Sequence, residues 1–254
     1  MHSRVQAPPS SSRTLYWFAV AVAAATISGC SDSKPESPLV SQPSRTQGAS
    51  GEHRYPARWW EPVSKEGAPD WEILPQEAQP GEVILSKRQP DLGLLSNFAP
   101  TPFTFHGQHY ASLEGLWQSM LYPEGRDDPR ATFPGLKWEH TRDQVSQMTA
   151  FEAKRAGDLA LSNMKKMGID WVSFEDRHFE YRPAEPGEHY RLIVEATWEK
   201  VKQNPDVRKA LLSTGELVLK PDHHQEPNAP AAWRYFEILT EIRKQLQVHP
   251  ERGE

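Results

Sequence analysis

Leu95-Ser96-Asn97-Phe98-Ala99-Pro100 and Ser112-Leu113-Glu114-Gly115-Leu116-Trp117-Gln118 are the two stretches that decide the fold. The first is typical of an irregular loop, and the second is typical of a helix that begins at an N-cap serine. At 3.6 residues per turn, Glu114 and Gln118 lie on one helix face, where they can line a common cleft. A carboxylate beside a buried apolar stripe is unfavourable unless it is paired or used, so Glu114 is a candidate site residue. The apolar stripe next to the pair consists of Leu113, Leu116, Trp117, Met120 and Leu121.

The rest of the sequence predicts short strands and longer helices. Strands are expected at 83–85 and 216–219, and as a pair around a Gly turn within 103–110. Residues 123–138 are rich in Pro, Gly and Asp and predict an exposed loop, whereas 170–172 predicts an irregular or short extended segment. Helices are expected from Ser112, over 149–168 with a capping box from Thr149 to Glu152, over 189–203, from Asn204-Pro205 to Gly215, and over 231–247. Five helices and few short strands indicate a helix-dominated α+β fold with a single domain.

Residues 1–29 are typical of a secretory signal peptide. Arg4 and Arg13 precede an apolar run from Leu15 to Ile27, which is too short for a good membrane span. The run closes with Ile-Ser-Gly-Cys, which resembles the lipobox of bacterial lipoproteins, where the cysteine becomes the lipid-modified first residue of the mature chain. Cys30 is the only cysteine, which excludes an internal disulfide and a Cys-rich zinc site. The alternative is a plain signal peptide followed by an incidental free thiol.

Lipidation at Cys30 predicts where the protein resides. More than one acyl chain gives stable anchoring that a single chain does not give. Ser31 follows the cysteine, and a serine there resembles the outer-membrane sorting pattern. We therefore expect a cell-envelope lipoprotein at the outer membrane, facing the periplasm and held to the membrane by its N-terminal lipid.

Composition divides the mature chain into a tether and a domain. Ten of the 23 prolines lie in the first 80 residues, so 30–80 is predicted to be a Pro/Ser-rich tether. Trp59-Trp60 and Trp71 are unusual in a tether, and we expect them to dock its end onto the domain; a carbohydrate-stacking or interface role is the alternative. The domain is expected at 81–247, long enough for one good core, with a tail at 248–254.

The net negative charge of the mature chain argues against strong binding to nucleic acid. The signal carries two basic residues and no acidic ones, so the mature chain has 27 Lys and Arg against 34 Asp and Glu. No basic stripe interrupts this acidic balance. No phosphate-cradling Gly motif is present, and His223-His224 has no third or fourth ligand at a recognisable spacing. We expect neither a cofactor nor a metal, and a small nucleotide-like ligand as the partner.

Three blocks of residues resemble those of the NADAR family, the YbiA-like N-glycosidases. The resemblance covers about residues 81–246. Members of this family are reported to cut N-glycosidic bonds, either in riboflavin-pathway intermediates or between ADP-ribose and guanine bases. The blocks are Leu95-Ser96-Asn97-Phe98 with Phe103, Gly107, Ser112, Glu114 and Gln118; Ala156-Gly157 with Asp170-Trp171; and Asn204-Pro205-Asp206 with Leu211-Leu212-Ser213-Thr214-Gly215.

The resemblance implies roles for individual residues. Glu114 matches the family's helix glutamate and is the expected catalytic carboxylate, which would stabilise an oxocarbenium-like sugar and activate water. Asp170 is the candidate second carboxylate. Trp171 matches an aromatic residue that would stack on the leaving base. The remaining matches are Asn97 and Phe98 in the opening loop and Gln118 one turn past the glutamate, with Asn97 and Gln118 expected to orient ribose hydroxyls.

The chain also departs from the family pattern. Leu121 stands where the family usually has a lysine. Residues 223–230 lack the glycines and the aspartate of the family's acidic loop before Trp233. Glu226 and Asp222 are the nearby carboxylates that could replace this aspartate.

These departures leave simpler interpretations open. In these interpretations, Glu114 is only a carboxylate that interacts with the helix dipole in an early turn, Trp171 is a core aromatic residue, and Asn97 is a turn residue.

Two main functions therefore remain. The first is a lipid-anchored N-glycosidase acting on an ADP-ribose-like or nucleotide-like substrate. The second is a catalytically degenerate module that binds a nucleotide, ADP-ribose or an envelope partner. Export favours the second, because it separates the domain from cytoplasmic NAD and chromosomal DNA. An envelope scaffold is a third possibility.

Overall fold

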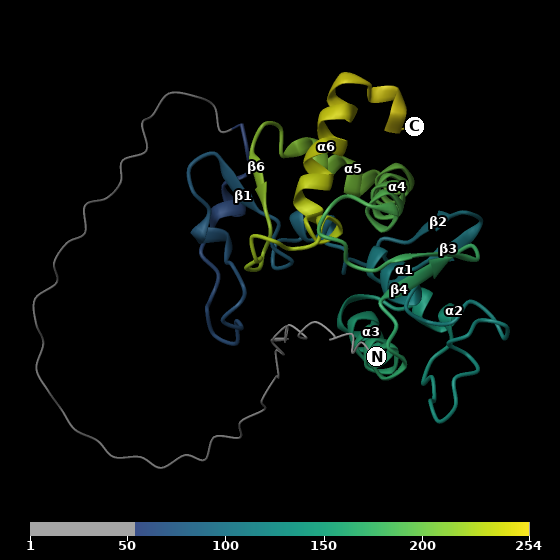
Figure 1. The fold of residues 1–254 in the computed structure, drawn as a ribbon. Coiled ribbons are helices and arrows are strands. Elements are labelled where there is room, and N and C mark those ends of the chain that lie inside the picture. The colour runs from purple at the N-terminus through teal and green to yellow at the C-terminus, as the bar shows by residue number, and fades with distance from the viewer. Residues whose placement is uncertain (1–53, 254) are drawn as a thin grey trace, which may run out of the picture. The chain divides into compact units, whose positions relative to one another are not determined.

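A computed structural model describes residues 54–253 of the chain. The signal peptide, Cys30 and most of the tether, as predicted above, lie outside the described residues. The described part belongs to one compact unit, which is drawn in colour in Figure 1. No helix in residues 54–253 combines the length and the apolar character that crossing a membrane would require.

Six α-helices dominate the described residues, which confirms the helix-dominated α+β class. They are α1 (Leu113–Ser119), α2 (Arg142–Ser146), α3 (Ala150–Met167), α4 (Glu188–Gln203), α5 (Pro205–Ser213) and α6 (Tyr235–Val248). Short 3-10 helices lie at Ala57–Trp60, Pro75–Glu77, Leu92–Leu95, Ala231–Trp233 and Pro250–Gly253.

Three two-stranded sheets accompany the helices. β1 (Glu82–Ile84) pairs in parallel with β6 (Val218–Lys220), and Figure 1 shows the two side by side. β2 (Phe103–Phe105) and β3 (Gln108–Tyr110) form the predicted antiparallel hairpin. β4 (Trp171–Phe174) and β5 (Arg177–Glu180) form a second hairpin, where only an irregular or extended segment was predicted.

The turns of the two hairpins explain why the sequence indicated only one of them. His106 and Gly107 both have positive φ, and the glycine is a recognisable signal for such a turn. Glu175 and Asp176 also both have positive φ, but neither residue is a glycine or an asparagine. The β4–β5 turn therefore leaves no distinctive signal in the sequence.

Capping determines where α1, α2 and α3 begin. The Ser112 hydroxyl accepts a hydrogen bond from the Gly115 amide at 2.9 Å, as predicted for α1. The capping box predicted at the start of α3 is wrong, because the Thr149 side chain makes no cap bond there. A complete capping box instead joins Thr141 to Gln144 at the start of α2, a helix that the sequence analysis did not predict. Gly168 ends α3 in the left-handed conformation, as predicted.

Residues 54–80, assigned to the tether from composition, pack against the rest of the described unit. Trp59 is fully buried in the main hydrophobic cluster, and its indole N–H donates to Asp91 at 2.8 Å. The Trp60 indole donates to the Glu82 carbonyl at 2.9 Å. Glu72 is buried and accepts two hydrogen bonds from Arg88, at 2.9 and 2.7 Å. The packed unit therefore begins earlier than residue 81.

Buried arginines hold the long segment between α1 and β4. Arg130 is fully buried, makes a close ion pair with Asp128 and donates to the Met120 carbonyl at 3.0 Å. Arg142 donates to the Ser173 carbonyl at 2.6 Å and pairs with Glu124 at 3.2 Å. Each buried guanidinium thus has a carboxylate partner, which offsets the loss of water around it.

Candidate active site

Glu114 and Gln118 form a buried pair in α1, as their spacing predicted. The Gln118 amide donates to a Glu114 carboxylate oxygen at 2.7 Å. Only 6% of each residue's surface is exposed. Burial raises the pKa of Glu114 to about 7, although the Gln118 hydrogen bond and Lys154 act in the opposite direction. Glu114 can therefore lose or gain a proton close to neutral pH.

The carbonyl end of Gln118 is also buried. Gln118 Oε1 accepts no hydrogen bond from the described residues. An unpaired buried acceptor costs about 1–3 kcal/mol. A protonated Glu114 or a ligand hydroxyl would supply the missing donor. The Glu114–Gln118 pair therefore has one unused hydrogen-bond acceptor, Gln118 Oε1, close to the ionisable carboxyl group of Glu114.

Gly157 in α3 makes room for the Gln118 side chain. A Cβ atom at this position would lie 1.7 Å from Gln118 Oε1 and 2.4 Å from Gln118 Cδ. Gly115 plays the corresponding part in α1, because its Cβ would lie 2.6 Å from the Met148 carbonyl oxygen. Two helix glycines, each normally unfavourable in a helix, therefore allow α1 to approach its neighbours closely.

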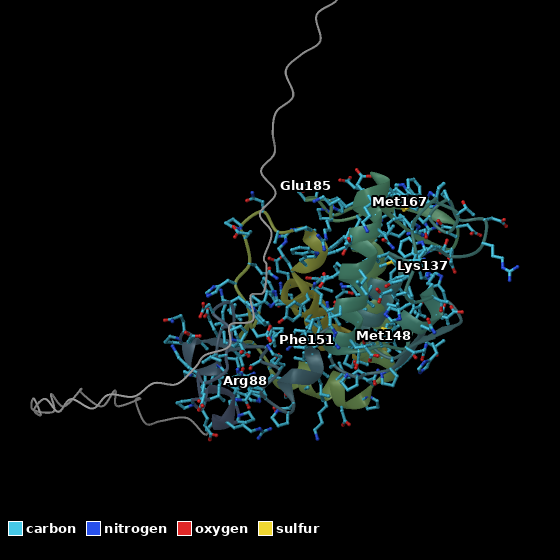
Figure 2. All side chains as sticks on the ribbon, turned by 90° about the horizontal axis from the view of Figure 1, so that it is seen from below. Arg88, Lys137, Met148, Phe151, Met167 and Glu185 are labelled. Atoms are coloured by element: carbon cyan, nitrogen blue, oxygen red, sulfur yellow. The ribbon has the colours of Figure 1, made fainter. Side chains whose placement is uncertain are left out.

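The loop at residues 96–98 covers the start of α1. The Asn97 carbonyl accepts a hydrogen bond from the Glu114 amide at 3.0 Å. The Asn97 side chain is half-buried and makes no hydrogen bond with the described residues. The Phe98 ring contacts the exposed ring of Phe151 edge-on, with ring centroids 5.2 Å apart. Figure 2 labels Phe151 near one end of α3 and Met167 at the other.

Trp171 and Asp170 lie in a different environment from Glu114. The Trp171 ring stacks on His178 with centroids 3.9 Å apart, and the Arg130 guanidinium lies 4.7 Å from its centroid. Two planar groups this close must occupy opposite faces of the ring, so a base would stack there only after His178 moved. Asp170 is exposed and is not among the charges that shift the pKa of Glu114. The structure therefore joins Glu114 to Gln118 and Asn97, but not to Asp170 or Trp171.

An aromatic and cationic group near Glu114 was missed by sequence reasoning. Burial raises the pKa of Tyr181, Arg182 opposes this shift, and the Glu114 carboxylate adds to it. The Tyr181 hydroxyl accepts a hydrogen bond from the Trp117 indole at 3.0 Å. The Arg182 guanidinium lies 4.6 Å from the Tyr181 ring and 4.7 Å from the ring of Trp233. Only Trp233 carried a signal in the sequence, through the family's C-terminal tryptophan.

Arg182 and His189 show that this neighbourhood is unusual. Arg182 has φ of +66°, a left-handed conformation that is uncommon for a residue other than glycine. His189 is fully buried among aromatic rings, and neither ring nitrogen has a hydrogen-bond partner in the described part of the chain. Burial lowers the pKa of His189 to about 4, with a further contribution from Arg182. Strained and unsatisfied groups gather at functional sites.

Two surface hollows lie away from Glu114. The first, of about 380 Å³, lies between the β2–β3 turn and α4, and the second, of about 270 Å³, lies between α4 and α6. Both are lined by Trp198 and Glu199. Glu114 and Gln118 line neither of these two hollows, and their small exposed fraction leaves little open surface for a ligand.

No metal site is evident among residues 54–253. No group of three or more His, Cys, Asp or Glu side chains there is arranged to hold a metal ion. His223 contacts the neighbouring Asp222 at 3.0 Å, and His224 is exposed. At Glu114 itself, the side-chain hydrogen-bond partner is the Gln118 amide.

Comparisons with known proteins give one structural similarity. No family model matches the sequence, and no curated protein matches it either. Among solved structures, the chain is similar to the NMR structure of the E. coli protein YbiA, with 16% identity over 68% of this chain and 89% of that chain. The TM-score is 0.40. A score of this size leaves the family and the function to be argued from the site.

Replacing Gly157 tests the packing of the pair. Gly157→Ala would normally stabilise a helix by about 1 kcal/mol. Here the new methyl group displaces Gln118 from Glu114, so we expect a loss of about 1–3 kcal/mol of unfolding free energy in urea titrations. In a Gln118→Ala background this loss should largely disappear. A stabilised Gly157→Ala single variant would contradict the described contact.

The raised pKa of Glu114 makes stability depend on pH. The folded chain keeps the Glu114 proton up to about pH 7, whereas the unfolded chain loses it near the ordinary glutamate pKa of 4.5. Stability therefore falls as pH rises through this window, by roughly 3 kcal/mol in total. Glu114→Gln should be more stable than the unmodified chain at pH 8 and similar to it at pH 4.5, as measured by urea unfolding.

The matched control for this experiment is Glu180→Gln. Glu180 is exposed, and its side chain makes no hydrogen bond with the described residues. Its replacement should change stability by less than about 0.5 kcal/mol at either pH. An identical pH dependence in the Glu114→Gln variant and the unmodified chain would show that Glu114 is ionised normally.

Proposed function

We propose that this chain is an N-glycosidase-like hydrolase that acts on an ADP-ribose-like or nucleotide-like substrate. One observation carries the proposal: Glu114 is a buried carboxyl group whose pKa is raised to about 7 and whose partner is a side-chain amide. A general acid or base works best when its pKa lies near the working pH. Glu114 meets this condition without a second carboxylate beside it.

The reaction follows from the chemistry of the C–N bond. As the bond breaks, its electron pair goes to the base nitrogen and positive charge develops on the sugar. The Glu114 carboxylate stabilises this charge and takes a proton from the attacking water, whose oxygen bonds to the anomeric carbon. The leaving base takes up a proton from solvent, and Glu114 returns to solvent the proton that it took, so that one water is added across the C–N bond. Gln118 Oε1 and the Asn97 side chain have hydrogen-bonding capacity left for ribose hydroxyls.

The leaving base needs an aromatic surface. Trp233 is better placed for this role than Trp171, because Arg182 connects Trp233 to Tyr181, and Tyr181 lies within electrostatic reach of Glu114. Trp233 is 39% exposed, whereas Trp171 stacks on His178. Stacking of a base on an aromatic side chain is worth about 1–3 kcal/mol in nucleic-acid binders.

Binding without turnover is the second candidate function. The observation that favours it is Leu121, which is fully buried where the resembling family usually carries a lysine. Asp170 does not compensate, because it is exposed and does not interact with Glu114. A site that lacks the family lysine and a second carboxylate in contact with Glu114 can retain a nucleotide without cutting it.

Turnover of ADP-ribosylated guanosine by residues 31–254 separates the two functions. Glu114→Gln should lower kcat/KM by about 100-fold or more, because general acid–base catalysis contributes at least this much. Glu180→Gln is the control and should retain full activity. If no variant turns over but ADP-ribose raises the melting temperature of each, the protein is a binding module.

The cellular location rests on the sequence alone. We propose that lipid on Cys30 anchors the protein to the outer membrane, with the domain in the periplasm. Cys30→Ala should release the protein into the soluble fraction after cell lysis, whereas the neighbouring Ser31→Ala should leave it in the membrane fraction. Continued membrane association of the Cys30→Ala variant would refute the lipid anchor.

A further inference from the structure

The loop at residues 96–98 links three helices through consecutive carbonyl groups. The Ser96 carbonyl accepts a hydrogen bond from the Lys200 ammonium of α4 at 2.7 Å. The Asn97 carbonyl accepts one from the Glu114 amide of α1 at 3.0 Å, and the Phe98 carbonyl accepts one from the Ala150 amide of α3 at 3.2 Å. Three neighbouring peptide groups of this loop are therefore each hydrogen-bonded to a different helix: α4, α1 and α3.

Lys200 is the member of this set with the highest energetic cost. Only 1% of its surface is exposed, and its ammonium makes no ion pair with the described residues. The bond to Ser96 is its one hydrogen bond there. Burial lowers the pKa of Lys200 to about 7. A single carbonyl partner offsets only part of the cost of removing an ammonium group from water. The hydrogen bond to Ser96 therefore does not explain, through stability alone, why a lysine is buried at position 200.

Two cations of the unit differ from Lys200 in having carboxylate partners, whereas the buried Arg243 has none among the described residues and donates to the Thr214 hydroxyl and the Leu217 carbonyl. Arg130 and Arg142 pair with Asp128 and Glu124 and hold backbone carbonyls as well. Lys202, two residues further along α4, is partly exposed and pairs with Glu199 at 2.9 Å. Lys200 alone among these groups is directed at the loop that contacts Glu114.

The consequence of the Lys200 bond lies one residue away. Ser96 and Asn97 share a peptide bond, which is planar and rigid. The Asn97 Cα is attached directly to this peptide unit, so a shift of the Ser96 carbonyl displaces the Asn97 backbone, whose own carbonyl accepts the hydrogen bond of the Glu114 amide. The same shift moves the Asn97 side chain, which has no hydrogen-bond partner of its own among the described residues.

We propose that Lys200 is a positioning residue for the site around Glu114, acting through the Ser96 carbonyl on Asn97 and on the start of α1. Its effect on catalysis rests on the proposed function, whereas its effect on the loop does not. A lysine that only fills the core would have the opposite profile, because its replacement would weaken the fold and leave the loop unchanged.

Lys200→Met in residues 31–254, the mature chain without its lipidation cysteine, tests the proposal. Methionine has a similar length and no charge to bury, so unfolding free energy at pH 7 should be unchanged or higher. Hydrogen exchange of the Glu114 and Ala150 amides, measured by NMR, should nevertheless accelerate at least tenfold. kcat/KM on ADP-ribosylated guanosine should fall at least tenfold.

Two further variants separate the explanations. Lys202→Met lies on the same helix without contacting the loop, and it should alter neither exchange nor turnover. Lys200→Arg restores a donor and should recover part of the lost protection. Unchanged amide exchange in Lys200→Met would overturn the positioning role, whatever the activity. If exchange accelerates but the unmodified chain shows no turnover, the positioning role stands and the glycosidase function fails.

Discussion

The structure depends on α1, a helix that has no exposed face. All seven of its residues are buried, so every polar group it carries must find a partner inside the protein. Ser112 caps its first turn, the Trp117 indole donates to Tyr181, and Glu114 accepts from Gln118. The space for this arrangement comes from Gly115 and Gly157, where a Cβ atom would collide with a neighbouring chain segment. The same burial that holds the helix gives Glu114 its unusual protonation.

Much of this site could be predicted from the sequence because its signals are local. The spacing of Glu114 and Gln118, the serine N-cap and the Gly turn of the first hairpin all act within a few residues. The β4–β5 turn could not be found in the same way, because Glu175 and Asp176 take a left-handed conformation that their residue types do not indicate. Tertiary contacts, rather than local preference, must stabilise that turn.

Long-range contacts account for the other differences. The docking of Trp59 and Trp60 was predicted, but proline content placed the start of the packed unit at residue 81, because the contact of Trp59 with Asp91 spans more than thirty residues. Lys200 was placed in a predicted helix, but its contact with Ser96 joins residues about a hundred positions apart, which no spacing rule reveals. Tyr181, just after β5, likewise comes near Glu114 only through a long-range contact, the hydrogen bond of its hydroxyl with the Trp117 indole of α1. Local sequence patterns therefore identify Glu114 and Gln118, whereas the residues around this pair are brought there by tertiary packing and cannot be found from local patterns.

The parallel pairing of β1 with β6 has a consequence for how the chain acquires its structure. β1 follows the N-terminal packed segment, yet its strand partner lies in the last quarter of the described residues. The isolated bridge between Glu72 and His223 has the same long separation. Contacts of high sequence separation form slowly, since a large loop must close before they contribute. During synthesis from the N-terminal end, β1 therefore lacks its strand partner until the C-terminal quarter of the described residues has emerged, and Val83 and Ile84 are not fully covered until then.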